Sequence, residues 1–299
     1  MSRSKFFQFG ISALGGLLIF ACDNDSTGPT AESPELGITA FDPAPQAPGI
    51  FLGPAVTAAV CFNGSQLDTD VDGIADVCEN ALALNFAPQL AYSSSDRVFR
   101  EMKWVARPLG GGRARVAYLL SYYFDDGLPG CPFGPILCGG HYGDSEDIVL
   151  DLYYNAGTQH WVLHQAMYSV HGNYYTYPRT LTAFPITLYY PGKPGGYPRV
   201  YVSFRKHANY GSDQECDAGV FTTDDCKANT FLQLIPTAAK NIGSRASHTS
   251  AQDCMASTNP LYSGNGVTEC YWTNRSFGGW QGKTPKASAY SPKLSALGF

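Results

Sequence analysis

Two carboxylates and an imidazole lie within six residues of one another near the middle of the chain. His141, Asp144 and Glu146 follow a pair of glycines and precede the apolar segment 148–152. In an extended strand Asp144 and Glu146 share one face, and the apolar residues continue that face. Two carboxylates at the end of a row that faces the core repel each other and lose hydration, so a cation would stabilise them. His141 precedes them closely enough to be a third ligand.

This mixture of ligands, in which oxygens dominate, favours Mg²⁺, Ca²⁺ or Mn²⁺ over Zn²⁺, with Ca²⁺ or Mg²⁺ the leading choices. The pattern predicts a divalent-cation site at the start of a strand. The alternative is that this end of the strand is solvated and carries ordinary surface groups. Spacing alone does not decide between the two.

A second polar cluster, Lys206, His207 and Tyr210, follows a predicted strand that ends at Phe204. His207 could be a general base, a metal ligand or a buried residue that only donates and accepts hydrogen bonds. The last role is the commonest one for a lone histidine. No catalytic residue can be assigned with these residues alone, and His207 is the single candidate. Lys206, His207 and Tyr210 together form a candidate binding cluster.

A third pattern, DxDxDGxxDxxE, occupies residues 68–79. Ca²⁺ needs six to eight oxygens around one point, and this spacing supplies carboxylates, one main-chain carbonyl and a final glutamate, with a glycine at the sharp turn. The alternative is an acidic turn that binds no ion. With no helix predicted before it, the segment resembles the calcium loops of dockerin and thrombospondin-type repeats, which implies a structural ion bound at roughly 10⁻⁴–10⁻³ M. The predicted calcium ligands are Asp68, Asp70, Asp72, Ile74, Asp76 and Glu79.

The N-terminus predicts export. Residues 1–21 combine a short basic start with an apolar run that has no acidic residue, which is typical of a signal peptide. The run ends at Ala21-Cys22, which resembles the lipobox of bacterial lipoproteins, although Phe20 is bulkier than the usual residue. The resemblance implies lipidation of Cys22 and a membrane-anchored protein of the cell envelope, periplasmic or at the outer surface. The alternative is an ordinary signal peptide with an unrelated cysteine.

The remaining cysteines fit an oxidising compartment. Of nine cysteines, setting Cys22 aside leaves eight, which occur as close sequential couples with no CxxC spacing that would favour zinc. Connectivity cannot be proved from spacing, but short-range pairing is the simplest arrangement and closes one loop per bond. The expected disulfides are Cys61–Cys78, Cys131–Cys138, Cys216–Cys226 and Cys254–Cys270.

Charge and composition narrow the class of protein. Removal of residues 1–21 leaves 18 Lys and Arg against 25 Asp and Glu, a net charge of −7, which argues against nucleic acid as a partner. The 19 tyrosines and 32 glycines favour strands and tight turns. We therefore expect an all-β sandwich with few short helices, stapled by disulfides.

The chain divides into four predicted parts. Residues 1–21 are the signal peptide, 22–60 a Pro-rich disordered tether, 61–84 the calcium loop with a short helix, and 85–299 the β-sandwich domain. The helix is expected over Asp76–Leu84, with a less favoured extension toward Ala91 across Pro88. Alternation and turn residues predict strands over Arg113–Tyr123, Asp147–Tyr154, His160–His171, Ile186–Tyr190 and Arg199–Phe204.

Three short motifs resemble the superfamily of necrosis-inducing (NPP1-like) proteins and Vps62-related domains. They are Asn85-Phe86-Ala87-Pro88-Gln89-Leu90, His141-x-x-Asp144-x-Glu146, and Lys206-His207-Ala208 with Tyr210. The family heptad has Trp where this chain has Ser145, which leaves the ligands intact. The resemblance implies a β-sandwich with a divalent cation held by His141, Asp144 and Glu146. The family's further aspartate corresponds to Asp126, or to Asp125.

The resemblance also implies a function, namely cation-dependent binding of glycans or of the sugar head groups of membrane lipids, without catalytic turnover. Two alternatives stay open. One is a metal-dependent hydrolase in which Asp144 and Glu146 hold the ion and His207 moves a proton to or from a bound water. The other is a surface lipoprotein in which the cation sites serve only stability.

Overall fold

The computed structural model describes residues 49–96, 99, 101–126, 141–170, 173–178, 188–189, 197–217, 224–247 and 290–299. These residues all belong to one compact unit that begins at Ala44. The predictions for the signal peptide and for Cys22 lie outside the described residues, as do those for Cys131, Cys138, Cys254 and Cys270. Among the described helices, none combines the length and the apolar character that a membrane span requires.

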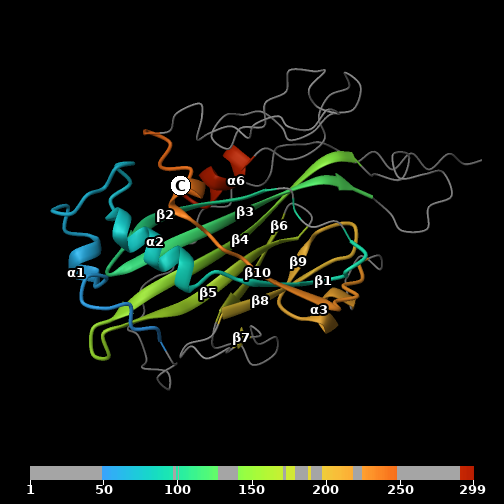
Figure 1. Cartoon of the computed structure of the whole chain (residues 1–299), viewed down its shortest axis with the longest axis horizontal. Helices are drawn as coiled ribbons and strands as arrows, with labels where there is room; N and C mark the ends of the chain where they lie inside the picture. The colour runs from blue at the N-terminus through green and yellow to red at the C-terminus, as the bar shows by residue number, and fades with distance from the viewer. Residues whose placement is uncertain are drawn as a thin grey trace, which may run out of the picture. The chain divides into compact units, whose positions relative to one another are not determined.

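Two β-sheets make up most of the described structure, which confirms the predicted all-β sandwich (Figure 1). The first sheet is an antiparallel meander in the order β2-β3-β4-β5-β6. Its strands are β2 (Glu101–Gly110), β3 (Arg113–Asp125), β4 (His141–Asn155), β5 (His160–Val170) and β6 (Asn173–Pro178).

The second sheet has the order β10-β1-β8-β7, with β9 paired to β8. The pairing of β1 with β8 is parallel and the others are antiparallel. Its strands are β1 (Gln89–Tyr92), β7 (Leu188–Tyr189), β8 (Tyr197–Val202), β9 (Asn209–Tyr210) and β10 (Thr230–Gln233). The described helices are short: α1 (Ala58–Cys61), α2 (Asp76–Asn85), α3 (Asp213–Asp217), the 3-10 helix η2 (Ala238–Lys240) and α6 (Tyr290–Ala296).

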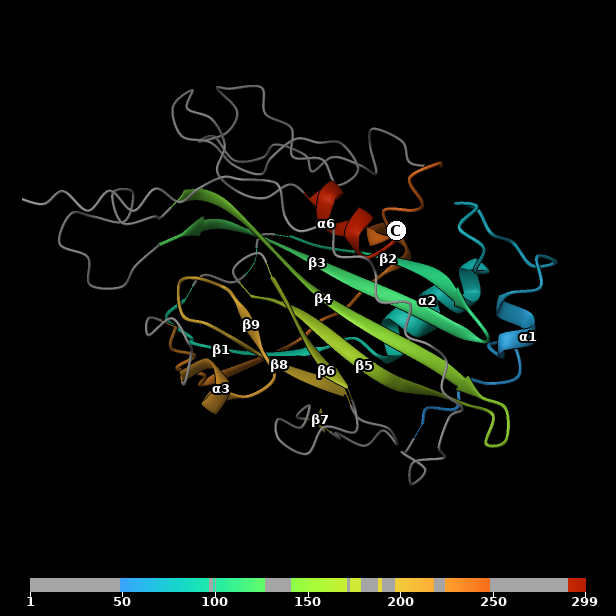
Figure 2. The same ribbon diagram turned by 180° about the vertical axis from the view of Figure 1, so that it is seen from behind.

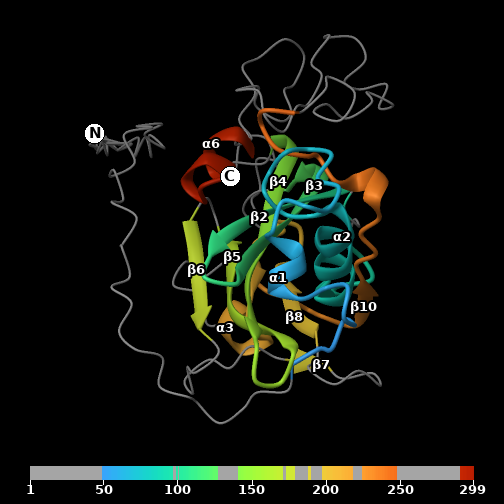
Figure 3. The same ribbon diagram turned by 90° about the vertical axis from the view of Figure 1, so that its left-hand side faces the viewer.

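Both faces of the first sheet are covered. The inner face packs against the second sheet and α2, and its buried side chains include Leu120, Ile148 and Leu150. The outer face carries a smaller cluster in which Leu294 and Leu297 of α6 contribute to the packing. Figures 2 and 3 show α6 against one face of the sheet and α2 against the other. Residues 144–152 of β4 are therefore buried on either face of the sheet, which matters for the carboxylates of this strand.

The ordered domain begins earlier than expected, so the predicted tether of residues 22–60 is too long at its C-terminal end. Ile50 exchanges two backbone hydrogen bonds with Trp161, at 2.8 and 3.0 Å. The Trp161 indole donates to the Val56 carbonyl at 2.7 Å, and Ile50 and Val56 are buried. Ile50 and Val56 bury apolar surface in the main core, which stabilises this part of the otherwise Pro-rich stretch against the domain.

The expected helix is confirmed, since α2 spans Asp76–Asn85. Its extension toward Ala91 is wrong, because the chain leaves the helix before Pro88 and enters β1 at Gln89. A residue before proline disfavours the helical conformation, which explains this boundary. The disulfides Cys61–Cys78 and Cys216–Cys226 are confirmed.

Candidate functional site

The carboxylates of Asp144 and Glu146 lie at the end of the core-facing row of β4. Asp144 pairs in register with Tyr122 of β3, and Glu146 pairs with Leu120. Their relative exposures are 8% and 5%, so the alternative of a solvated strand end is wrong for these two residues. Strand alternation aligned them with Ile148, as the sequence predicted.

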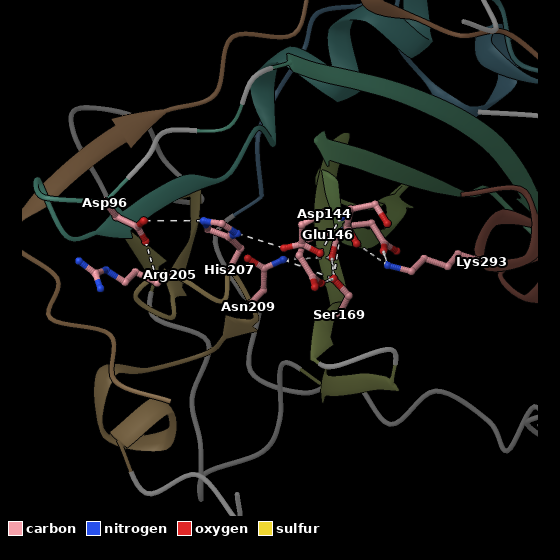
Figure 4. A network of polar contacts seen from close by, with 10 residues as sticks. Asp96, Asp144, Glu146, Ser169, Arg205, His207, Asn209 and Lys293 are labelled. Atoms are coloured by element: carbon pink, nitrogen blue, oxygen red, sulfur yellow. Dashed lines mark hydrogen bonds and ion pairs between the residues drawn. The ribbon is translucent and has the colours of Figure 1, made fainter. Parts of the chain in front are cut away.

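His207 lies between two aspartates that come from different parts of the chain (Figure 4). Its Nδ1 atom is 3.0 Å from Oδ2 of Asp144, and its Nε2 atom forms a longer ion pair, at 3.7 Å, with Oδ1 of Asp96. The imidazole stacks on the ring of Tyr122, with centroids 3.8 Å apart and planes 8° from parallel. It is 1% exposed. The ring is thus fixed on its face and on both of its nitrogen edges.

The charge of His207 follows from these contacts. Burial alone disfavours the imidazolium, but the hydrogen bond to Asp144 and the proximity of Asp96 outweigh it and raise the pKa of His207 to about 9. With these contacts His207 is a cation at neutral pH. A protonated, buried imidazole is poorly suited to accept a proton from water, so the geometry does not favour His207 as a general base.

The loop that carries His207 is tight. The His207 amide donates to the Ser203 carbonyl at 3.0 Å, and the Ser203 amide donates to the Ala208 carbonyl at 2.9 Å. Arg205 and His207 both have positive φ values, 66° and 61°. Such values are uncommon for residues other than glycine, although histidine tolerates them better than most. The backbone thereby turns the imidazole of His207 toward β4.

Lys206 and Tyr210 support this loop instead of offering binding groups. Lys206 forms an ion pair with Asp224 at 3.2 Å, and the Tyr210 hydroxyl donates to the other carboxylate oxygen of Asp224. Both residues are buried, with exposures of 7% and 4%. Their predicted role in a binding cluster is corrected for that reason, because their polar ends are engaged within the protein.

A second protein cation approaches from α6. Lys293 donates to the Ser145 carbonyl at 2.6 Å and lies 3.3 Å from Oδ1 of Asp147, a carboxylate that also accepts from the Tyr174 hydroxyl. Asp147 points to the outer face of the sheet, where α6 covers it. Lys293 could not be predicted from the sequence, because almost 150 residues separate it from the carboxylates and a single lysine in a short helix usually faces solvent.

Glu146 is buried close to other acids. Burial raises its pKa well above the usual range, and Asp144 and Asp147 raise it further, although Lys293 and a hydrogen bond donated by Ser169 act in the opposite direction. A carboxyl with a raised pKa binds a proton or needs a cation near it. Among the described side chains, the acids near this end of the strand are Asp96, Asp144, Glu146 and Asp147, and the cations that contact them are His207 and Lys293. Farther along the strand, Asp151 pairs with Arg115.

The other predicted ligands are placed less favourably or are not described. Asp126 forms an ion pair with Arg205 at 3.3 Å and its side chain is 37% exposed. His141 opens β4 opposite Asp125, but its side chain lies outside the described residues. Among the side chains that the structure describes, Asp126, Asp144 and Glu146 do not bring three ligand atoms within 4.8 Å of one another. The full four-ligand set therefore stays a prediction.

A small cavity lies beside His207. Its volume is about 10 Å³, close to what one water molecule needs, and Asp96, Tyr122 and His207 line it together with apolar side chains of β1 and β10. The Nε2 atom of His207 is buried, faces Asp96, and makes no hydrogen bond to a described residue. The cavity beside it is lined mainly by apolar side chains and is about the size of one water molecule.

The predicted calcium loop brings its carboxylates together. Ligand oxygens of Asp70, Asp72 and Glu79 lie within 4.8 Å of one another, as do those of Asp68, Asp70 and Asp76. Gly73 has a φ of 96°, as the sharp turn requires. The disulfide of Cys78 with Cys61 ties the end of this loop to α1.

Comparison with known proteins returned no matching family model and no matching curated protein. Among solved structures, the non-toxic HaNLP3 protein matches at 13% identity over 62% of this chain and 86% of that chain, with a TM-score of 0.32. NLPPya in complex with glucosamine matches at 13% identity over 64% and 84%, with a TM-score of 0.31. The Necrosis and Ethylene inducing Protein 2 from the causal agent of cocoa's Witches Broom disease matches at 16% identity over 52% and 55%, with a TM-score of 0.20.

The solved structures that are similar to this chain thus include necrosis- and ethylene-inducing proteins. At these identities and TM-scores the likeness does not establish that the chain belongs to their family. The NPP1-like, Vps62-related and calcium-loop resemblances stay predictions from the sequence.

Proposed function

We propose that this protein binds polyhydroxylated ligands, glycans or lipid head groups, through a divalent cation held at Asp144 and Glu146. His141 and Asp126 are the further ligands that the sequence suggests. The observation that carries the proposal is the burial of two carboxyl groups, Asp144 and Glu146, on the same face of β4, where Asp144 raises the pKa of Glu146. A divalent ion between two such groups would relieve their mutual repulsion, and oxygen ligands favour Ca²⁺ or Mg²⁺.

The cation would also provide the binding chemistry. Ca²⁺ and Mg²⁺ take more oxygen ligands than two carboxylates supply, so positions are left for hydroxyl groups of a ligand. The buried pair of His207 and Asp144 fixes one carboxylate in place, since the 3.0 Å contact orients Asp144. In this proposal His207 is a positioning residue and touches no ligand. No described feature favours the hydrolase alternative.

The cellular setting belongs to the same proposal. Lipidation at Cys22 would attach the domain to a membrane of the cell envelope, where glycans and lipid head groups are at hand. The acidic net charge of the exported part argues for a cation-bridged contact with such ligands over a direct contact with anionic groups.

The test compares ligand retention with and without the ion. Purified protein is applied to glycan arrays and to vesicles of neutral glycolipids in Ca²⁺, in Mg²⁺ and in chelator. We expect retention in at least one of the two cations, loss in chelator, and at least a tenfold loss in the double variant Asp144→Asn/Glu146→Gln. Retention by glycans alone or by vesicles alone identifies the source of the ligand.

The matched control is Asp225→Asn, which removes an acid from an exposed ion pair with Lys227. It should bind as the wild type does. Absence of retention under every condition, or retention that survives both chelator and the double variant, would contradict the proposal.

A further inference from the structure

Four carboxylate oxygens in residues 68–79 are buried and have no hydrogen-bond partner in the part of the chain that the structure describes. They are both oxygens of Asp70, Oδ2 of Asp72 and Oε1 of Glu79. Glu79 is 1% exposed, and one of its oxygens lies within 4.8 Å of ligand oxygens of Asp70 and Asp72. A buried carboxylate oxygen without a donor is costly, so three such groups around one point indicate a ligand that the side chains themselves do not supply.

The other two acids of the loop already have partners. Asp68 accepts hydrogen bonds from the amides of Asp72 and Gly73, at 3.2 and 2.9 Å. Asp76 accepts from the amide and hydroxyl of Thr69, at 2.8 and 2.6 Å. These contacts shape the turn and leave the free oxygens with the remaining three residues. Asp72 contributes to the turn as well, because its Oδ1 atom accepts from the Ile74 amide at 2.7 Å, but its Oδ2 atom is left for a ligand.

The same loop is joined to a segment far along the chain. Asn241 donates to Oε2 of Glu79 at 3.3 Å, and the Ser244 hydroxyl donates to the main-chain carbonyl of Asp70. The amide of Ile242 donates to the Trp104 carbonyl at 2.9 Å, so this segment lies along β2. Because β2 is at one end of its sheet, residues 241–244 cover part of an edge that would otherwise expose unpaired backbone groups.

We propose that one Ca²⁺ ion binds Asp70, Asp72 and Glu79, and that the bound ion fastens residues 241–244 to the edge of β2. The main-chain carbonyl of Ile74 is a further ligand by its place in the pattern. The ion holds the Glu79 carboxylate where it accepts a hydrogen bond from Asn241. It also holds Asp70 where its main-chain carbonyl accepts a hydrogen bond from the Ser244 hydroxyl. This site is separate from the one at β4, and it does not rest on the proposed function.

Calcium titration of the Glu146→Gln protein followed by calorimetry isolates the loop from the β4 site. We expect one bound Ca²⁺ with a dissociation constant of roughly 10⁻⁴–10⁻³ M. Adding Glu79→Gln, or Asp70→Asn if that protein does not fold, should weaken binding at least tenfold. Glu101→Gln, a change at a partly exposed acid paired with Lys103, is the control and should leave the constant unchanged.

Amide hydrogen exchange of the wild-type protein tests the fastening. Calcium should slow exchange at Ile242 about tenfold and leave central amides of β3 and β4 unchanged. Failure of calcium to bind, or binding that survives Glu79→Gln and Asp70→Asn, would overturn the site. Binding without any change at Ile242 would overturn the fastening. Glycan retention by the Glu79→Gln protein is expected to persist, so failure here is distinguishable from failure of the proposed function.

Discussion

The acidic loop at residues 68–79 and the carboxylates around β4 both bury negative charge, but they differ in what neutralises it. At the loop, the neighbours that shift the pKa values most, after burial, are other carboxylates, and the pKa of Asp72 rises to about 7 and that of Glu79 to about 11. At β4, His207 and Lys293 supply positive charge from within the protein. The proposed calcium ion would therefore act on acids with no basic residue in their own segment, whereas the acids of β4 contact two basic side chains.

This difference separates two uses of a cation. An ion that completes a loop with no positive side chain of its own contributes to stability, because folding creates its site. An ion added to carboxylates that are already partly compensated contributes less to stability and is more easily exchanged. Such an ion is suited to carry a ligand.

Removal of Lys293 should cost the most stability. Lys293→Met leaves Asp147 buried beside Glu146 without its cation, and breaking a buried ion pair in this way costs about 3–5 kcal/mol. Urea denaturation in chelator measures the loss. Lys227→Met, which breaks an exposed pair, should change the free energy of unfolding by less than about 1 kcal/mol. Equal effects of the two substitutions would show that β4 is not balanced by Lys293.

The contribution of His207 should depend on pH. Its folded-state pKa of about 9 lies above the ordinary value of 6.5, so its stabilising effect is complete below about pH 6.5 and is lost as the pH rises through about 9. His207→Asn keeps a residue that tolerates positive φ and removes the charge, at a cost of about 2–3 kcal/mol at pH 6.

The measurement is the difference in unfolding free energy between wild type and His207→Asn, in chelator, from pH 6 to pH 10. The difference should shrink with rising pH. A difference that is constant over this range would show that His207 is neutral in the folded protein. Lys293 would then be the cation that distinguishes β4 from the acidic loop.

Calcium should stabilise the fold by a smaller amount. At a tenfold excess over the dissociation constant, an ion that binds only the folded state adds about 1.4 kcal/mol. For a domain of this size the increase in Tm is about 3–6 °C. Differential scanning calorimetry in calcium and in chelator measures it, and magnesium serves as the control because its demand for near-octahedral geometry fits this loop less well. Equal shifts by both ions would contradict a calcium-selective loop.

The smallest effect concerns the backbone of the loop. Val71 has a φ of 56° and is 74% exposed, so a β-branched residue occupies a left-handed conformation without burying its side chain. Val71→Asn should raise stability by on the order of 1 kcal/mol, because asparagine adopts this conformation more readily. A gain of equal size in calcium and in chelator, measured by urea denaturation, would show that the turn is formed before the ion binds. A gain seen only in calcium would mean that the ion creates the turn.

The two regions also differ in how far the sequence predicts them. The loop has all its acids within twelve residues, so spacing alone predicted which side chains converge. Alternation likewise predicted that Asp144 and Glu146 face the core with Ile148. These are local properties, set by the periods of strands and turns.

The remainder of the β4 site could not be predicted, because it depends on contacts distant in sequence. Asp96, His207 and Lys293 come from three separate segments, and their roles follow from how sheets and α6 pack. The same holds for Lys206 and Tyr210, whose shared partner Asp224 lies in another loop and turns them away from ligand binding. The role of Ile50 in the core was not predicted, because the Pro-rich composition around it indicates a disordered tether. Its two backbone hydrogen bonds with Trp161 depend on a strand more than 100 residues away.

The calcium-induced change in Tm, measured in parallel on the wild type, Glu79→Gln and Glu146→Gln, tests the division of roles most directly. Both substitutions replace one buried carboxyl group by an amide, and they differ only in the region affected. We expect the calcium shift to fall strongly in Glu79→Gln and to persist in Glu146→Gln. A shift that is unchanged in Glu79→Gln and lost in Glu146→Gln would place the stabilising ion at β4 and contradict the division of roles.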